Sequence, residues 1–307
     1  MGWMRLAMLV IALLAWGAAE ARPEPAENGN GKEGVKPRGH LKDNSYLIEE
    51  SYNQEQGVVQ HIFNWVGFWT HNQGQSREFS WQYTCEIPIG SEKHQFSFQF
   101  PMLQFVDIPD GGLSEEQGGV GDMQLNYRYQ LLMEDEHGWV PAVSPRVSLI
   151  LPTGDKTRGL GNGEYGFQFN LPISKQIEPF AFHFNAGYTT TPGVTLPLDS
   201  GLLSAPRDLN GYNLGASVIW LVNYDFNLML EWVLFYNEDI DGIGFPANTT
   251  EIIVNPAFRW AVWTSDDIQW VLGLGVPIGL SEDAPDIGVF GYMSVEHRAK
   301  KEKKNEE

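Results

Sequence analysis

"GDMQLNYRYQLL", residues 121–132, alternates between polar and apolar side chains without a break from Asp122 to Leu131. Successive side chains of an extended strand point to opposite faces, so this stretch predicts a strand with one apolar face and one polar, charged face. The apolar face carries Met123, Leu125, Tyr127, Tyr129 and Leu131, and the polar face carries Asp122, Gln124, Asn126, Arg128 and Gln130. In a soluble sandwich the apolar face covers a core, whereas in a membrane barrel it meets lipid and the polar face lines a lumen.

The same alternation recurs along most of the chain, and no long stretch has a helical period. Clear examples are residues 79–87, 96–102, 165–173, 180–188, 212–220, 226–236, 252–262 and 268–278, and weaker ones are 58–68, 140–151 and 286–295. The pattern predicts an all-β fold of about 12 strands of about ten residues, the length that a tilted strand needs to cross a bilayer.

Two further features favour a membrane barrel over a sandwich. Several apolar rows end in aromatic residues, as girdles at the membrane interfaces do: Tyr165, Tyr188, Tyr212, Trp220, Tyr236 and Trp263. Tight connections, such as 176–178 and 223–225, also alternate with longer ones, such as 152–162 and 189–210. Short turns at one end and long loops at the other are typical of such barrels. The expected fold is a single antiparallel up-and-down transmembrane β-barrel.

The ends of the chain indicate export. Residues 1–21 contain a basic Arg5, an apolar run from Leu6 to Trp16 and the sequence Ala19-Glu20-Ala21, which together predict a signal peptide. The alternative, a spanning anchor, needs about 20 apolar residues, and this run is about half as long. We expect a flexible periplasmic segment over 22–56, the barrel over 57–297 and a charged tail over 298–307.

Composition excludes several classes of protein. Lys and Arg number 20 against 39 Asp and Glu, a net charge of −19, so nucleic acid is not an expected partner. The one cysteine, Cys85, excludes internal disulfides and cysteine clusters for zinc. The acidic loops lack the spacing of a calcium cage, and we expect no metal and no cofactor.

Charged residues on the polar rows are the candidate functional residues, because a charge facing lipid near the bilayer midplane costs about 2–4 kcal/mol. The residues expected to line the lumen and the path of a solute are Glu78, Glu86, Asp122, Arg128, Arg146, Glu164, His183, Glu231 and Arg259. They fit two compatible interpretations: acid–arginine pairs that hold a packed interior together, or a constriction that selects solutes by charge and size. The longest loop, 189–210, could fold inward and plug the lumen.

Enzymatic motifs are weak. "GNGEYG", residues 161–166, fits a dinucleotide-binding glycine pattern, but a strand follows it where that motif needs a helix. An outer-membrane lipid hydrolase would need a serine, a histidine and an acid or amide on the wall. His183 and Asn185 share one face, which is the one hint of such a site, and we do not expect an enzyme.

Taken together, "GVGDMQLNYRYQLL", "VSPRVSLILPTGD", "LGNGEYGFQFNLPISKQI" and "FHFNAGYTTT" resemble the outer-membrane family named for the MetA pathway of phenol degradation. The likeness continues through "EIIVNPAFRWAV" and "WVLGLGVPIGLSEDAPDIGVFGYMSVEH", and spans residues 58–297. The resemblance implies a barrel in the outer membrane of a Gram-negative bacterium that moves small organic molecules, aromatic or hydrophobic ones among them. One departure is the C-terminus, since such barrels usually end on an aromatic residue and here "EHRAKKEKKNEE" follows Val295.

The sequence therefore predicts a porin-like channel or transporter through which a small organic solute passes passively. Its expected partners are outer-membrane lipid, lipopolysaccharide, the barrel-assembly machinery and the solute. The first alternative is a structural or adhesion barrel that does not conduct, and the lipid hydrolase is the second.

Overall fold

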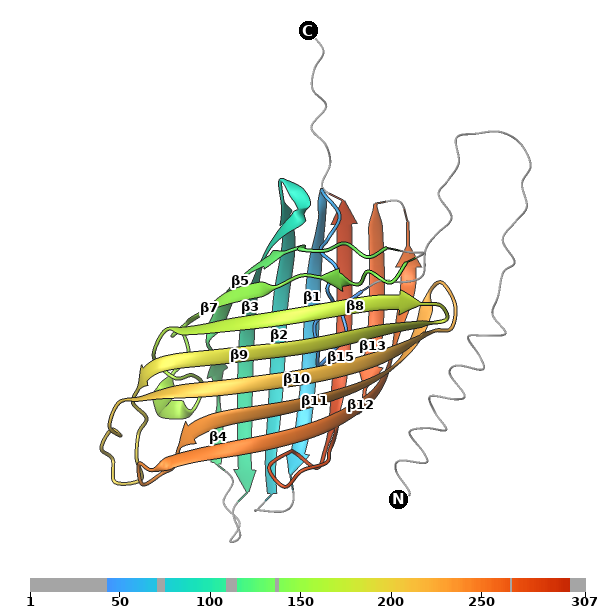
Figure 1. Cartoon of the computed structure of the whole chain (residues 1–307). Coiled ribbons are helices and arrows are strands. Elements are labelled where there is room, and N and C mark those ends of the chain that lie inside the picture. Colours follow the sequence, from blue (N-terminus) through green and yellow to red (C-terminus); the bar gives the residue numbers. More distant parts are fainter. Residues whose placement is uncertain (1–42, 71–74, 109–114, 136–137, 266, 299–307) are drawn as a thin grey trace, which may run out of the picture.

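The computed structural model describes residues 43–70, 75–108, 115–135, 138–265 and 267–298 (Figure 1). The predicted signal peptide, residues 22–42 and the tail beyond Arg298 lie outside these ranges. The strands are β1 (Val58–Thr70), β2 (Gln75–Ile89), β3 (Ser91–Ile108), β4 (Glu115–Val120), β5 (Met123–Tyr129), β6 (Ala142–Val143), β7 (Arg146–Leu151), β8 (Gly166–Ile177), β9 (Phe180–Val194), β10 (Arg207–Leu221), β11 (Phe226–Ile240), β12 (Pro246–Thr264), β13 (Ile268–Gly275), β14 (Ile278–Gly279) and β15 (Ile287–Arg298). One 3-10 turn, Lys156–Arg158, lies between β7 and β8. No helix in these ranges is long and apolar enough to cross a membrane.

The strands form a closed antiparallel barrel. Each crossing of the wall pairs with the next in chain order, and β1 pairs with β15 from Val58 opposite Arg298 to Trp69 opposite Ile287. The short pairs β4/β5, β6/β7 and β13/β14 each make one crossing, so the wall has 12 strands, as the sequence predicts. In Figure 1, β8 to β12 cross the front of the barrel, with β1, β2, β3 and β15 behind them.

The apolar rows face outward and the polar rows face inward. In the stretch that opens with Gly121, Tyr127 is 40% exposed, whereas Asn126 and Arg128 are 2% exposed. Phe167 and Leu230 follow the same rule on β8 and β11, since both are more than half exposed. A soluble sandwich would show the reverse pattern, with large apolar side chains buried and charged ones in water. The membrane-barrel arrangement predicted from the alternation is therefore the one observed.

Some strands differ from the expected length of about ten residues. β12 has 19 residues and β3 has 18, because they extend past both ends of the predicted strands over 252–262 and 96–102. The predicted strand over 268–278 is interrupted after Gly275: the Val276 N–H bonds to the Pro256 carbonyl, and Pro277 has no N–H to pair. A similar break at Gly121 and Asp122 separates β4 from β5.

A non-strand segment fills the middle of the barrel. Residues 43–57, here called the inner segment, precede β1 and lie inside the wall, with Ser51 and Glu50 among their most buried members. The chain turns from the inner segment into β1 at Gly57, whose φ of 84° lies in the left-handed region that favours glycine. The flexible segment expected over 22–56 stays a prediction for residues 22–42, which lie outside the described ranges, whereas residues 43–56 make hydrogen bonds to the wall.

We call the barrel end that carries Val58, Gly90 and Arg298 the turn end, and the opposite end the loop end. The loop over 189–210, which the sequence left open as a plug, gives residues 189–194 to β9 and 207–210 to β10. In the stretch between these strands, Leu196 packs against Val194, Leu209 and Ile240, and the Asp199 N–H donates to the Gly242 carbonyl at 2.9 Å. Among the described residues, the segment that fills the middle of the lumen is the inner segment, which precedes β1 in the chain.

Candidate functional site

The lumen around the inner segment is the candidate functional site. The inner segment pairs with no strand, so its backbone N–H groups need other acceptors. Inward side chains of the wall provide them. The pairs are Tyr46 N and Leu47 N to Glu231 Oε1 (2.9 and 3.1 Å), Glu49 N to Asn185 Oδ1 (2.7 Å), Ser51 N to Ser174 Oγ (2.9 Å), Asn53 N to Gln130 Oε1 (3.2 Å) and Gln54 N to Gln95 Oε1 (2.7 Å).

Glu49 is held by two arginines. Its carboxylate lies 3.1 Å from Arg128 Nη1 and 2.8 Å from Arg146 Nε, and Asn170 Nδ2 donates to it at 2.7 Å. Burial alone would raise the pKa of Glu49, but Arg146 and Arg128 outweigh it and hold the pKa below its ordinary value. Glu49 is therefore an anion that locks the inner segment to β5 and β7.

Glu50 has its own arginine on the opposite part of the wall. Arg259 Nη1 on β12 donates to Glu50 Oε1 at 2.8 Å, and Ser45 Oγ donates to the same oxygen at 2.8 Å. Burial would raise the pKa of Glu50, but Arg259, with a smaller contribution from His183, holds it below the ordinary value. Arg259 also donates to the Asp43 carbonyl, so one side chain binds two points of the inner segment.

The apolar residues of the inner segment pack against β10 to β15. The ring of Tyr46 stacks on Phe290 with centroids 5.0 Å apart and planes within 3°, and its hydroxyl donates to the Phe258 carbonyl at 2.5 Å. Two wall glycines make room: a Cβ at Gly273 would overlap Tyr46, and one at Gly215 would overlap Ile48. The wall is therefore shaped to the inner segment as well as charged for it.

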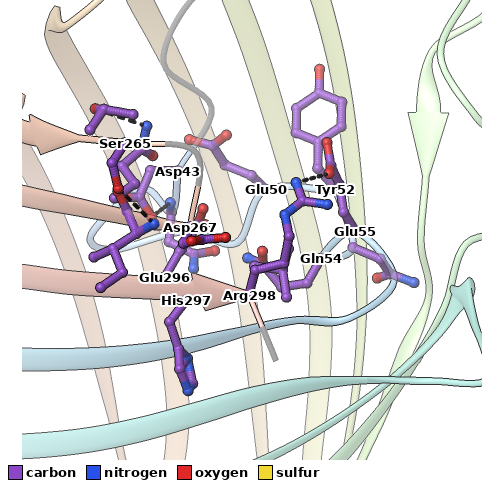
Figure 2. Close-up of a pocket in the computed structure, with 16 residues that line it drawn as sticks. Asp43, Glu50, Tyr52, Gln54, Glu55, Ser265, Asp267, Glu296, His297 and Arg298 are labelled. Carbon is purple, nitrogen blue, oxygen red and sulfur yellow. Dashed lines mark hydrogen bonds and ion pairs between the residues drawn. The ribbon is translucent and has the colours of Figure 1, made fainter. Parts of the chain in front are cut away.

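The inner segment separates two cavities. The turn-end cavity, about 300 Å³, is lined by both ends of the segment and by β13 and β15 (Figure 2). Its carboxyl groups are Asp43, Glu50, Glu55, Asp267 and Glu296. The loop-end cavity, about 240 Å³, is lined by Asn44 to Glu49 and by inward residues of β1 to β3, β5, β7 to β11 and β15. A solute that crosses the lumen must pass the inner segment between them.

The predicted lumen residues fall into two groups. Glu86, Arg128, Arg146, His183, Glu231 and Arg259 face the lumen around the inner segment. Glu78 lies on β2 nearer the loop end, opposite Phe68 and Phe105. Asp122 accepts the N–H groups of Gly154 and Asn162 at 2.8 and 3.0 Å, so it fastens the loop before β8 to the wall. Glu164 belongs to that loop and lies outside any strand.

Ser174, His183 and Glu50 lie in the serine–histidine–acid sequence of contacts that a hydrolase triad has. The burial of Ser174 is not compatible with attack on a substrate. Ser174 Oγ and His183 Nδ1 are 2.7 Å apart, and His183 Nε2 lies 3.9 Å from Glu50 Oε2. Ser174 is fully buried and accepts the Ser51 N–H, so the hydroxyl that would attack a substrate is covered by the inner segment. The described residues also contain no group of three or more His, Cys, Asp or Glu that could hold a metal ion.

The position of the inner segment inside the barrel was not predicted from the sequence. Its contacts join residues far apart, such as Tyr46 and Glu231, and leave no local period. The available signal was the change of composition at "SYLIEE", residues 45–50, where three apolar residues and two acids precede the first strand. Inward arginines on β5, β7 and β12 needed acidic partners, and these two acids were unassigned.

The sequence matches no protein-family model and no curated protein. Among solved structures, the crystal structure of the COG4313 outer membrane channel from Pseudomonas putida F1 superposes with a TM-score of 0.61 at 13% identity, covering 84% of this chain and 99% of that one. The NanC porin superposes with a TM-score of 0.47 at 10% identity, covering 76% of this chain and 98% of that one. The β domain of the Bordetella autotransporter BrkA superposes with a TM-score of 0.49 at 8% identity, covering 80% of this chain and 100% of that one. The chain thus shares the fold of an outer membrane channel.

Proposed function

We propose that this chain is an outer-membrane channel of a Gram-negative bacterium, through which a small organic molecule passes passively. The observation that carries the proposal is the inside-out barrel whose lumen holds two cavities, both lined by residues of the inner segment. A barrel that served as a membrane anchor alone would need neither cavity. The charged lumen fits passage of a solute selected by size and polarity.

Family and location are parts of the same proposal. The shared fold and the motifs in residues 58–297 support membership of the family named for the MetA pathway of phenol degradation. Residues 1–21 would direct export, and the barrel-assembly machinery would insert the chain. The outward apolar rows would then contact lipid, and the loop end would meet lipopolysaccharide. The family resemblance supports aromatic or hydrophobic molecules as substrates.

Passage requires that the inner segment move, because it lies across the path. Side chains rather than a strand ladder hold its backbone, and each such hydrogen bond contributes about 0.5–1.5 kcal/mol net. The ion pairs of Glu49 and Glu50 add the stronger contacts. The inner segment can therefore be displaced without opening a pair of wall strands.

Conductance in planar bilayers tests the proposal. We expect the full chain to conduct weakly and a variant lacking residues 43–56 to conduct several-fold more. Gel mobility that changes on heating serves as the control for folding of both proteins. Folded proteins that conduct in neither form, and that admit no solute into liposomes, would contradict the proposal and support the structural or adhesion barrel.

A further inference from the structure

The loop-end cavity has a lining that points to one class of solute. Amides dominate its polar side, including Asn64, Gln82, Gln99, Gln168 and Asn213. An amide offers both a donor and an acceptor, which suits hydroxyl groups that can also do both. A lining of this kind differs from the apolar surface that a purely hydrophobic molecule would need.

The charges at this cavity balance one another. The two acids that line it, Glu49 and Glu86, are matched by Arg146 and Arg128: Glu49 contacts both arginines, and Glu86 Oε2 lies 3.6 Å from Arg128 Nη2. A charged solute would lose its hydration there without finding an unmatched counter-charge. The cavity therefore favours a neutral solute.

Several hydrogen-bonding groups of the lining have capacity left. The side chains of Gln99 and Asn213 line the cavity, are half-buried and make no hydrogen bond within the described ranges. Each amide can therefore both donate to and accept from a solute in the cavity. Asn64 Oδ1, Asn170 Oδ1 and Glu86 Oε2 also accept no hydrogen bond from any described residue, but these atoms are buried and are not open to a solute.

The size of the cavity and the apolar side chains in its lining restrict the class of solute that it can bind. A volume of about 240 Å³ equals that of about eight water molecules in the liquid, which suits a molecule with a single small ring. Ile62 and Phe235 line the cavity beside the amides. A sugar or cyclitol ring has C–H groups that can contact such side chains while its hydroxyls meet the amides.

We propose that the loop-end cavity binds a neutral polyhydroxylated solute of monosaccharide size. This inference rests on the proposed function, since it names the substrate class of the same lumen. It differs from the aromatic or hydrophobic class that the family resemblance implies. The two classes make opposite demands on Gln99 and Asn213, because replacement by leucine removes hydrogen bonds to a polyol but adds apolar surface for a hydrophobic molecule.

Saturation-transfer NMR on the purified full chain in detergent tests the inference, with myo-inositol as the polyol probe and toluene as the apolar one. We expect saturable binding of myo-inositol, weakened at least tenfold by the double substitution Gln99→Leu and Asn213→Leu. Asn237→Leu is the matched control, because Asn237 is on the inward row of β11 but does not line the cavity. The single variant Gln99→Leu replaces the double variant if the latter fails the heat-mobility test for folding.

The outcomes separate the two proposals. Absence of saturable myo-inositol binding, or equal weakening by Asn237→Leu, would overturn the polyol assignment, as would toluene binding that competes with myo-inositol and is strengthened by the double substitution. Because binding is measured without flux, a protein that conducts but binds no polyol refutes this inference alone. A protein that binds myo-inositol but never conducts refutes the channel and leaves the binding site standing.

Discussion

The phenol hydroxyl of Tyr46 occupies the space that a Cβ atom on Gly273 would fill. Tyr46 belongs to the inner segment and Gly273 to the inward row of β13, so the wall glycine and the inner aromatic ring form one fitted contact. Stacking of Tyr46 on Phe290 and Tyr292 of the neighbouring strand fixes the ring in place. A larger residue at position 273 would therefore overlap most with Tyr46 and displace the inner segment.

We expect Gly273→Val to displace the inner segment while the barrel stays closed. Overpacking typically costs about 1–3 kcal/mol. Release of Tyr46 relieves the larger overlap, and the Phe258 carbonyl oxygen on β12, 2.8 Å from the added Cβ, must shift by a smaller amount. The readout is maleimide labelling of Ser51→Cys in a Cys85→Ala background, since Ser51 is fully buried and Cys85 is the only natural cysteine. Labelling should accelerate at least tenfold.

The control for this experiment is Gly291→Val. Gly291 lies on β15, and its nearest neighbour to an added Cβ, Trp65, is 3.7 Å away, so the substitution has room. Equal labelling rates in the Gly273 and Gly291 variants would mean that the contact with Tyr46 does not hold the inner segment.

Glu49→Gln should release the inner segment by removing the charge that faces Arg128 and Arg146. Taking one partner from a buried ion pair leaves the other charge uncompensated and costs about 3 kcal/mol. Glu55→Gln is the matched control, because the pair of Glu55 and Arg298 is 70% and 53% exposed and such pairs contribute about 0–1 kcal/mol. Labelling of Ser51→Cys and bilayer conductance should both rise for the first variant and stay unchanged for the second. The ion-pair account fails if Glu55→Gln has the larger effect.

The alternation of polar and apolar residues made the wall predictable from sequence. Successive side chains of a strand point to opposite faces, so the outward position of Tyr127 and the inward position of Arg128 could be predicted without knowledge of any partner residue. The breaks at Gly121 and Pro277 were not resolved, because alternation of side chains continues across a local loss of ladder hydrogen bonds. The inner segment was missed for a different reason: Glu49 finds Arg146 97 residues away, and no local pattern encodes such a contact.

The outward rows make a prediction about lipid. Leu230 is 53% exposed on β11, and Leu280 is 60% exposed after β14 at the loop end. An arginine facing lipid near the midplane costs about 2–4 kcal/mol, whereas one near the interface costs about 0–1 kcal/mol. Leu230→Arg should therefore lower the free energy of unfolding in liposomes far more than Leu280→Arg, as measured by urea titration. Equal losses would show that Leu230 does not face hydrocarbon.

Acid should loosen the inner segment. The pKa values of Glu49 and Glu50 lie below the ordinary 4.5, so the carboxylates stabilise the segment at higher pH, and this contribution is lost as the pH falls below about 4.5. Glu49 faces Arg128 and Arg146, and Glu50 faces Arg259 and His183. Amide hydrogen exchange over residues 44–52, corrected for the intrinsic effect of pH, should show protection at pH 7 and its loss near pH 3. The double variant Glu49→Gln, Glu50→Gln should exchange rapidly at both pH values. Protection that persists in acid, or that survives in the double variant, would mean that the apolar contacts of Tyr46 to Ile48 hold the inner segment without help from the two ion-paired acids.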